Sequence, residues 1–209
     1  MIVAHGKFVL ATPSKCGTHS FKALANATTG MQWINTMHLM EVPEEYSDLD
    51  RILIVRDPYD RLVSIYNFLL HNRSQWGSNA IQGMSFDEFV EWFGGQRGLH
   101  LTDPRATSRR APWLWLWSCS ENERIFLPDT FWHLEDADEC LKWLIEEYSL
   151  RTKKRDLETM YRGNTADSYR AGQTWPLSQY YRRKSTLRRV NRMWAEADCK
   201  LFDYEYREV

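Results

Sequence analysis

The sequence has 209 residues and a formal net charge of −1, and hydrophobic residues make up 43% of it. This composition excludes a disordered chain, and no apolar run approaches the roughly 18 residues that a membrane-spanning helix needs. We therefore expect one soluble domain over residues 1–209, with no membrane span.

The first part of the chain contains two strand-to-helix units. Residues 7–11 are apolar enough for a buried strand, and a helix is predicted next from apolar side chains at helical spacing: Phe21, Leu24, Ala25 and Thr28. Residues 52–55 form a continuous apolar run, which is typical of a parallel strand covered on both faces. Asp57 and Pro58 then begin a helix that runs to about Leu70. Two such units predict an α/β fold with a central parallel sheet flanked by helices.

The second part of the chain alternates short strands with helices. Ser85 and Glu88 have the spacing of a capping box, which predicts a helix to about Phe93. Residues 124–127 and 130–134 indicate short strands, and residues 136–148 a helix. The polar stretch 151–173 indicates loops. The last helix is predicted over residues 177–200, with core contacts from Leu187, Val190, Met193 and Trp194.

A lysine lies in the turn of small residues that follows the first strand, in ATPSKCGTHS, residues 11–20. The start of a helix presents backbone N–H groups that can bind an anion, and Lys15 adds a positive charge there. Gly17 lets the backbone approach a ligand closely, and Thr18, His19 and Ser20 supply further donors. The loop is not a Walker A motif, because Lys15 precedes Gly17 and the first glycine is missing. The alternative is an ordinary strand-to-helix turn.

A second candidate site follows the next strand. Arg56 lies at the carboxyl end of that strand, where open α/β sheets bind ligands. Ser64 comes eight positions later, about two helical turns along, so both side chains could reach one phosphate. The alternative is structural, with Arg56 held by Asp57 or Asp60 and Ser64 as a small packing residue.

Together these two segments resemble the sulfotransferase family. Residues 12–20 match its first signature, a loop with lysine and glycine, and its second signature is matched by Arg56, Pro58, Arg61 and Ser64. The resemblance continues at residues 134–136, where such enzymes carry a Glu-Asp pair, and at residues 195–205, which resemble the end of the carbohydrate-type branch. It is weakest over residues 76–117. The resemblance implies a sulfotransferase fold like that of the P-loop nucleotide kinases.

The resemblance also implies a chemistry. Sulfotransferases carry a sulfuryl group from 3′-phosphoadenosine 5′-phosphosulfate (PAPS) to an acceptor hydroxyl or amine without a metal, leaving 3′-phosphoadenosine 5′-phosphate (PAP). By similarity, the loop would hold the 5′-phosphosulfate with Lys15, Cys16, Gly17, Thr18, His19 and Ser20, Cys16 serving as a space-filler. Arg56 and Ser64 would hold the 3′-phosphate. Lys15 would also be catalytic, since negative charge grows on the oxygen that bridges phosphorus and sulfur.

The acceptor hydroxyl needs a general base, and His38 is the preferred candidate. It stands where it resembles the catalytic histidine of the cytosolic branch, and an unperturbed imidazole titrates near roughly pH 6.5. The lysine that usually stands two residues earlier is Thr36 here. Glu41 or Glu44 could serve instead, and a structural role for His38 is the third possibility.

The residues that would recognise adenine and acceptor are less defined. Family aromatic residues near adenine are replaced by Ser20 and Leu134, so Trp33 or the basic segment 162–170 could contact adenine. Residues 108–117 combine basic residues with tryptophans, which stack on sugars or fill cores. The acceptor could thus be a glycan, or a small alcohol or phenol.

A basic cluster near the end of the chain contains Arg182, Arg183, Lys184, Arg188 and Arg189. We interpret it first as a solvated helix face, with an anionic glycan or nucleic acid as the alternative partner. Nucleic-acid binding is not part of the main expectation.

The cysteines and the chain start bear on metal binding and location. The four cysteines lie far apart, which indicates free thiols rather than a zinc site or disulfides, and no metal is expected. The opening MIVAHGKF lacks the features of a signal peptide, so we expect a cytoplasmic protein. The rival functions are a divergent phosphate-loop kinase that uses ATP and an inactive nucleotide-binding protein.

Overall fold

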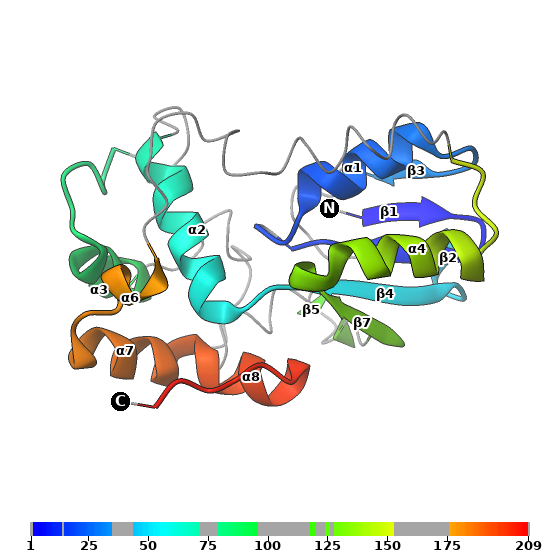
Figure 1. Ribbon diagram of the computed structural model, residues 1–209. Helices are drawn as coiled ribbons and strands as arrows, with labels where there is room; N and C mark the ends of the chain where they lie inside the picture. The colour runs from blue at the N-terminus through cyan, green and yellow to red at the C-terminus, as the bar shows by residue number, and fades with distance from the viewer. Residues whose placement is uncertain are drawn as a thin grey trace. The chain divides into compact units, whose positions relative to one another are not determined.

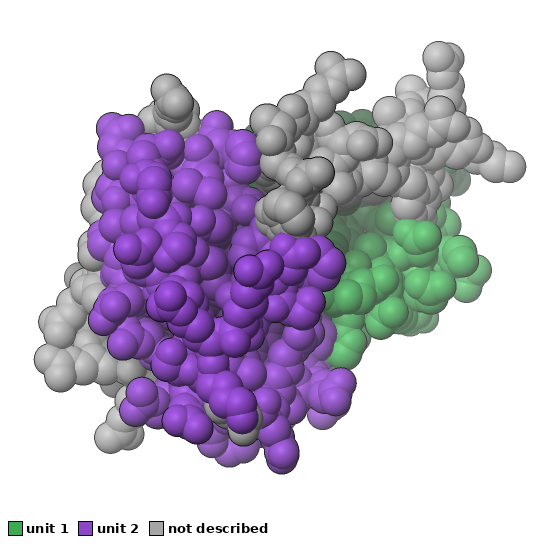
Figure 2. Space-filling model, turned by 60° about the vertical axis from the view of Figure 1, so that its left-hand side comes forward, with its two compact units in different colours: residues 1–56, 117–170 green, residues 57–116, 171–209 purple. Residues whose placement is uncertain are grey.

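A computed structural model describes residues 2–13, 15–34, 44–71, 79–95, 118–119, 124–125, 128–152 and 176–208. The chain forms two compact units, residues 1–56 with 117–170 (unit 1) and residues 57–116 with 171–209 (unit 2), coloured separately in Figure 2. The expectation of a single domain stays a prediction.

Unit 1 is built on a five-stranded mixed sheet with the order β3-β1-β2-β4-β7 (Figure 1). The strands are β1 (Ile2–His5), β2 (Phe8–Ala11), β3 (Gln32–Ile34), β4 (Asp50–Val55) and β7 (Thr130–His133). The three neighbours β2, β4 and β7 are parallel, as the continuous apolar run in β4 predicts. The α/β class is therefore confirmed.

The two remaining strands were not predicted. β1 pairs antiparallel with β2, with His5 opposite Phe8, so Gly6 and Lys7 form the turn of a hairpin. β3 in turn pairs antiparallel with β1. The expected strand at residues 124–127 corresponds to β6 (Arg124–Ile125), which pairs with β5 (Ser118–Cys119), and residues 126–127 lie outside the described residues. The five-stranded sheet thus has a parallel centre of β2, β4 and β7, extended by an antiparallel edge of β1 and β3.

Helices α1 (Thr18–Ala27) and α4 (Ala137–Glu147) share one hydrophobic core with β2 and β4. Alternate strand residues face this core, and its most buried members include Phe8, Leu10, Phe21, Leu24, Ile52, Ile54, Cys140 and Leu144. Burying a side chain of this size contributes about 1.5–3 kcal/mol. This core holds the first turn of α1 directly behind the end of β2, and so fixes the loop between them.

Unit 2 is helical among its described residues (Figure 1). Its helices are α2 (Pro58–His71), α3 (Phe86–Gly95), α6 (Leu177–Tyr180), α7 (Lys184–Val190), the π-helical turn η5 (Asn191–Ala195) and α8 (Glu196–Phe202). The predicted capping box is confirmed, because the backbone N–H of Ser85 donates to Glu88 Oε2 at 2.8 Å and that of Glu88 to Ser85 Oγ at 3.4 Å.

The prediction of one continuous helix over residues 177–200 is wrong. The chain leaves the helix at Tyr181 and re-enters it at Lys184. Tyr180 and Tyr181 both contact the ring of Phe86, at centroid distances of 5.2 and 5.1 Å. Consecutive residues of an α-helix point about 100° apart, so packing two neighbouring tyrosines on one ring requires the break.

A buried acid and a buried base lie in unit 2. Asp198 of α8 is 4% exposed and Arg61 of α2 is 2% exposed. Burial raises the pKa of Asp198 to about 7, and the charge of Arg61 opposes that rise. Arg61, which matches the second signature, is therefore a core residue of unit 2, and a carboxyl that holds its proton near neutrality is packed with it.

We expect this carboxyl to make stability fall as pH rises. Between an unfolded pKa near 4 and a folded pKa of about 7, the folded state holds a proton that the unfolded state releases. The free energy of unfolding of the wild type, relative to Asp198→Asn, should therefore drop by about 3 kcal/mol from pH 5 to pH 8. Urea unfolding of both proteins at each pH measures the difference. A constant difference would contradict the raised pKa.

Candidate functional site

The three parallel strands of unit 1 end at one edge of the sheet. Ala11 of β2 pairs with Leu53 of β4, and Val55 of β4 pairs with His133 of β7. In open α/β sheets, ligands bind beyond the carboxyl ends of the parallel strands. The segments that follow β2, β4 and β7 therefore leave the sheet where a ligand site is expected.

The loop after β2 is a tight turn with two left-handed residues. The backbone N–H of Cys16 donates to the carbonyl of Pro13 at 3.0 Å, which closes the turn. Lys15 has φ = 67° and Gly17 has φ = 77°. Glycine adopts this conformation without penalty, whereas a residue with a Cβ loses roughly 1–2 kcal/mol. Strain at Lys15 is typical of a backbone held in place for function.

Arg56, the first residue after β4, contacts this loop. Its Nη1 donates to the backbone carbonyl of Lys15 at 3.0 Å, and both side chains are half-buried. The hydrogen bond fixes the strained Lys15 peptide and brings two cationic residues from different strand ends together. The two segments that the sequence analysis connected are thus neighbours in unit 1, and two adjacent cations favour a ligand with more than one negative charge.

Helix α1 has Gly17 as its N-cap, which offers no side-chain cap, and its first turn contains no acidic residue. The first N–H groups of any helix lack partners within the helix and carry the positive end of its dipole. Thr18 Oγ1 lies 3.4 Å from the Pro13 carbonyl and 3.4 Å from Thr12 Oγ1, which ties the helix start to the loop. Ser20 is half-buried and His19 is exposed. The arrangement can bind an anion.

The segment after β7 also touches the loop. A Cβ added at Gly17 would lie 2.6 Å from Leu134 Cδ1. Leu134 begins the 3-10 turn Leu134–Asp136, and His133 Nδ1 lies 3.7 Å from Asp136 Oδ2. This packing was not predicted, because Leu134 was interpreted as the end of a strand and as the replacement of a family aromatic residue beside the Glu-Asp pair. A glycine in the first loop and a third parallel strand beside it are the signals that could have indicated it.

The remaining predicted site residues are placed as follows. The Cys16 side chain is fully buried in the core of unit 1, behind the loop. Ser64 belongs to unit 2, half-buried on α2. His38 and Glu41 lie outside the described residues, as do segments 108–117 and 162–170. Glu44 begins the 3-10 turn Glu44–Tyr46, of which the structure describes only the backbone at Glu44.

Two further predictions concern exposed residues. Trp33 on β3 is 37% exposed, and Lys22 Nζ lies 3.6 Å above the centre of its ring.

In the basic cluster, Arg183 and Arg189 form ion pairs of 3.1 Å with Asp87 and Glu91 of α3. These two arginines join α7 to α3 through ion pairs at the surface of unit 2.

Among the described residues, no three or more His, Cys, Asp or Glu side chains come together in a way that could hold a metal ion. Within the same part of the chain, no helix has the length and apolar character needed to cross a bilayer.

The contact between Gly17 and Leu134 predicts a specific pattern of destabilisation. Gly17→Ala combines a left-handed φ with a steric clash, whereas Gly30→Ala has φ = 82° and only an ordinary 3.5 Å contact with His5. We expect unfolding free energy to fall by about 1 kcal/mol for Gly30→Ala and by about 2–4 kcal/mol for Gly17→Ala. The double variant Gly17→Ala/Leu134→Ala should lose less unfolding free energy than the sum of the losses of the two single variants, because removing the Leu134 side chain removes the clash. Additive effects in chemical denaturation would contradict the contact.

Comparison with known proteins agrees with this geometry. A family model described as the sulfotransferase family matches residues 1–205, which include both signatures and residues of both units. No curated protein and no solved structure gives a significant match. The resemblance inferred from the two signatures is confirmed, and the chain belongs to the sulfotransferase family.

Proposed function

We propose that the chain transfers a sulfuryl group from PAPS to the hydroxyl of an acceptor. Family membership supports sulfotransfer in general. The observation that best supports PAPS as the donor is the 3.0 Å hydrogen bond from Arg56 to the Lys15 carbonyl, which joins the two signature segments at one sheet edge. A donor with phosphate groups at both ends of its ribose requires two neighbouring cationic sites of this kind.

In this proposal each segment binds one end of the donor. Lys15 and the first N–H groups of α1, at Gly17 to Ser20, bind the 5′-phosphosulfate. Arg56 and Ser64 bind the 3′-phosphate, which ATP lacks. Ser64 shares a half-buried stripe of α2 with Asp60 and Asn67, so it is not packed in the core of its unit. Adenine contacts are assigned to Trp33 or to residues 162–170.

The transfer is an in-line displacement at sulfur. A base takes the proton of the acceptor hydroxyl, the new oxygen–sulfur bond forms, and the bond from sulfur to the bridging oxygen breaks, which releases PAP. Lys15 and the helix dipole stabilise the charge that grows on the bridging oxygen. His38 is the proposed base, with Glu41 or Glu44 as its alternatives, and the acceptor is a glycan or a small alcohol or phenol. A cytoplasmic location is part of the same proposal.

Ligand preference tests the donor. Calorimetric titration with PAP, ADP and ATP should show the tightest binding for PAP, and labelled sulfate should then be transferred from PAPS to an acceptor. Preference for ATP would instead support a phosphate-loop kinase. PAP binding without transfer to any hydroxyl acceptor would support an inactive nucleotide-binding protein.

Arg56 should determine the preference for the 3′-phosphate. Arg56→Met is expected to weaken PAP binding about 10–100-fold, because a charged hydrogen bond to the 3′-phosphate is lost. It should weaken adenosine 5′-phosphate binding by a clearly smaller factor, because the Lys15 loop loses only the support of the 3.0 Å hydrogen bond. Arg51→Met is the matched control, since Arg51 lies on β4, just before Arg56 in the chain, and also donates to a backbone carbonyl, that of Ser47 at 2.8 Å. Equal weakening of both nucleotides by Arg56→Met would contradict its role.

Lys15 should act mainly on rate. Lys15→Met is expected to lower turnover on the order of 10²–10³-fold, with a smaller loss of PAP affinity, because its charge acts on the developing oxyanion. Lys142→Met, an exposed change on α4 of the same unit, serves as the control and should keep full turnover. Steady-state rates with labelled PAPS measure both. A change in PAPS affinity alone would assign Lys15 to binding only.

A further inference from the structure

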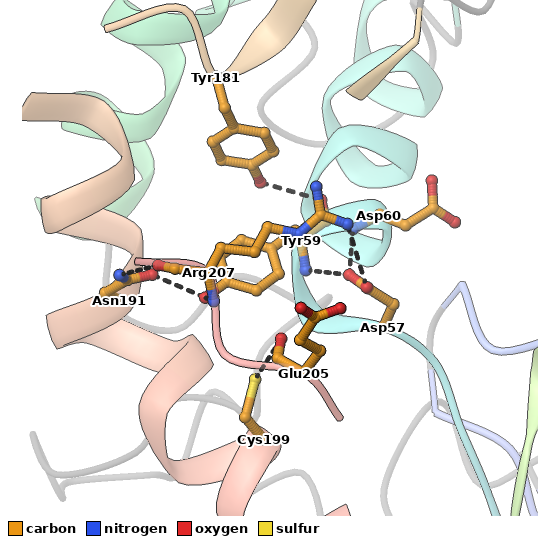
Figure 3. A network of polar contacts seen from close by, with 8 residues as sticks. All are labelled: Asp57, Tyr59, Asp60, Tyr181, Asn191, Cys199, Glu205 and Arg207. Atoms are coloured by element: carbon orange, nitrogen blue, oxygen red, sulfur yellow. Dashed lines mark hydrogen bonds and ion pairs between the residues drawn. The ribbon is translucent and has the colours of Figure 1, made fainter. Parts of the chain in front are cut away.

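The C-terminal segment of unit 2 lies against the start of α2, where eight residues form the polar network shown in Figure 3. We propose that Arg207 in this segment is a positioning residue for the 3′-phosphate end of the donor site, acting through Asp57 and Tyr59. This inference rests on the proposed function and adds to it a residue far along the chain from either signature.

The backbone of Arg207 is hydrogen-bonded into a closed set of contacts with Tyr59 and Asn191. The Arg207 N–H donates to the Tyr59 hydroxyl at 3.1 Å, and that hydroxyl donates to Asn191 Oδ1 at 2.8 Å. Asn191 Nδ2 in turn donates to the Arg207 carbonyl at 2.9 Å. Tyr59 and Asn191 are almost fully buried. Burial raises the pKa of Tyr59 to about 12, so the hydroxyl keeps the proton that it donates.

The side chain of Arg207 contacts the same helix start (Figure 3). Its guanidinium carbon lies 4.9 Å from the centre of the Tyr59 ring, and Nη2 lies 3.5 Å from Asp57 Oδ2. Asp57 Oδ1 accepts the backbone N–H groups of Tyr59 at 2.8 Å and Asp60 at 2.9 Å, as an N-cap does. One carboxylate is thus shared between the first turn of α2 and Arg207.

Tyr181 adds a second support to this turn. Its hydroxyl donates to the Tyr59 carbonyl at 2.9 Å, and its ring meets the Tyr59 ring edge-on at 5.7 Å. The first turn of α2 is therefore held by the cap, by the segment after Tyr180 and by the C-terminal segment. Contacts from three parts of unit 2 fix its rotation about the helix axis.

That rotation matters for the donor because of what lies on either side of the turn. Asp57 directly follows Arg56, whose guanidinium is bonded to the Lys15 carbonyl. Ser64 lies seven residues after Asp57, about 10 Å along the helix axis on the same side. A change in the orientation of the first turn shifts Ser64, which lies on the same helix. Arg207 contacts Asp57, Tyr59 and Asn191, so we place its effect on Ser64 in this turn.

The test compares nucleotides that differ only in the 3′-phosphate. In Arg207→Ala, measured well below its melting temperature, we expect PAP to bind about 3–10-fold more weakly and adenosine 5′-phosphate to bind as in the wild type. The KM for PAPS should rise while kcat is kept. Arg207→Lys keeps the positive charge near Asp57 and should restore part of the preference. It also supplies a measurement if the alanine variant fails to fold.

Two controls separate positioning from general stabilisation. Lys200→Ala removes the 2.9 Å surface ion pair with Glu196 in the same C-terminal region. It should change neither the affinity for PAP nor the affinity for adenosine 5′-phosphate. Asp57→Asn should lower the preference for PAP as Arg207→Ala does, and combining the two should give little further loss, because both act through one contact.

The outcomes distinguish this inference from the proposed function. If the wild type shows no preference for PAP over adenosine 5′-phosphate, the proposed donor is wrong and the role of Arg207 is overturned with it. If the wild type prefers PAP and Arg207→Ala retains the full preference, only the role of Arg207 is overturned. Equal weakening of both nucleotides would likewise assign Arg207 to stability alone.

Discussion

The hydrogen bond from Arg56 to the carbonyl of Lys15 is the interaction on which the candidate site depends. It holds a lysine in a left-handed conformation that its own side chain disfavours, and it couples the ends of two parallel strands. Without it, the loop after β2 and the residue after β4 would be two separate cationic features. With it, they form one surface of unit 1 suited to a multiply charged anion.

Close packing behind this surface explains why the loop after β2 consists mostly of small residues. Gly17 leaves room for Leu134, Cys16 fills the core beneath, and Thr18 ties the helix start to Pro13. Each of these positions accepts only a small or specific side chain. The loop is therefore specified as much by the hydrophobic core and the third parallel strand as by any ligand.

Much of the fold could be predicted from the sequence, because the signals for it are local. The apolar run of β4, the capping box at Ser85 and the helical spacing in α1 each lie within one element, and all were confirmed. The hairpin strand β1 was missed because its pairing depends on a turn without a strong signal. The break at Tyr181 depends on Phe86, which is distant in sequence, so helical periodicity alone could not reveal it.

The division of the chain between the two units has a consequence for biosynthesis. Unit 2 takes residues from 57–116 and again from 171–209, so α2 and α3 emerge from the ribosome long before α7 and α8. Until the last few dozen residues follow, Tyr59, Tyr66 and Phe86 have no partners from that end of the chain and expose apolar rings. Contacts of such long sequence separation slow folding and prolong the exposure of aggregation-prone surface. Nascent chains stalled before the C-terminus would then be natural clients for chaperones.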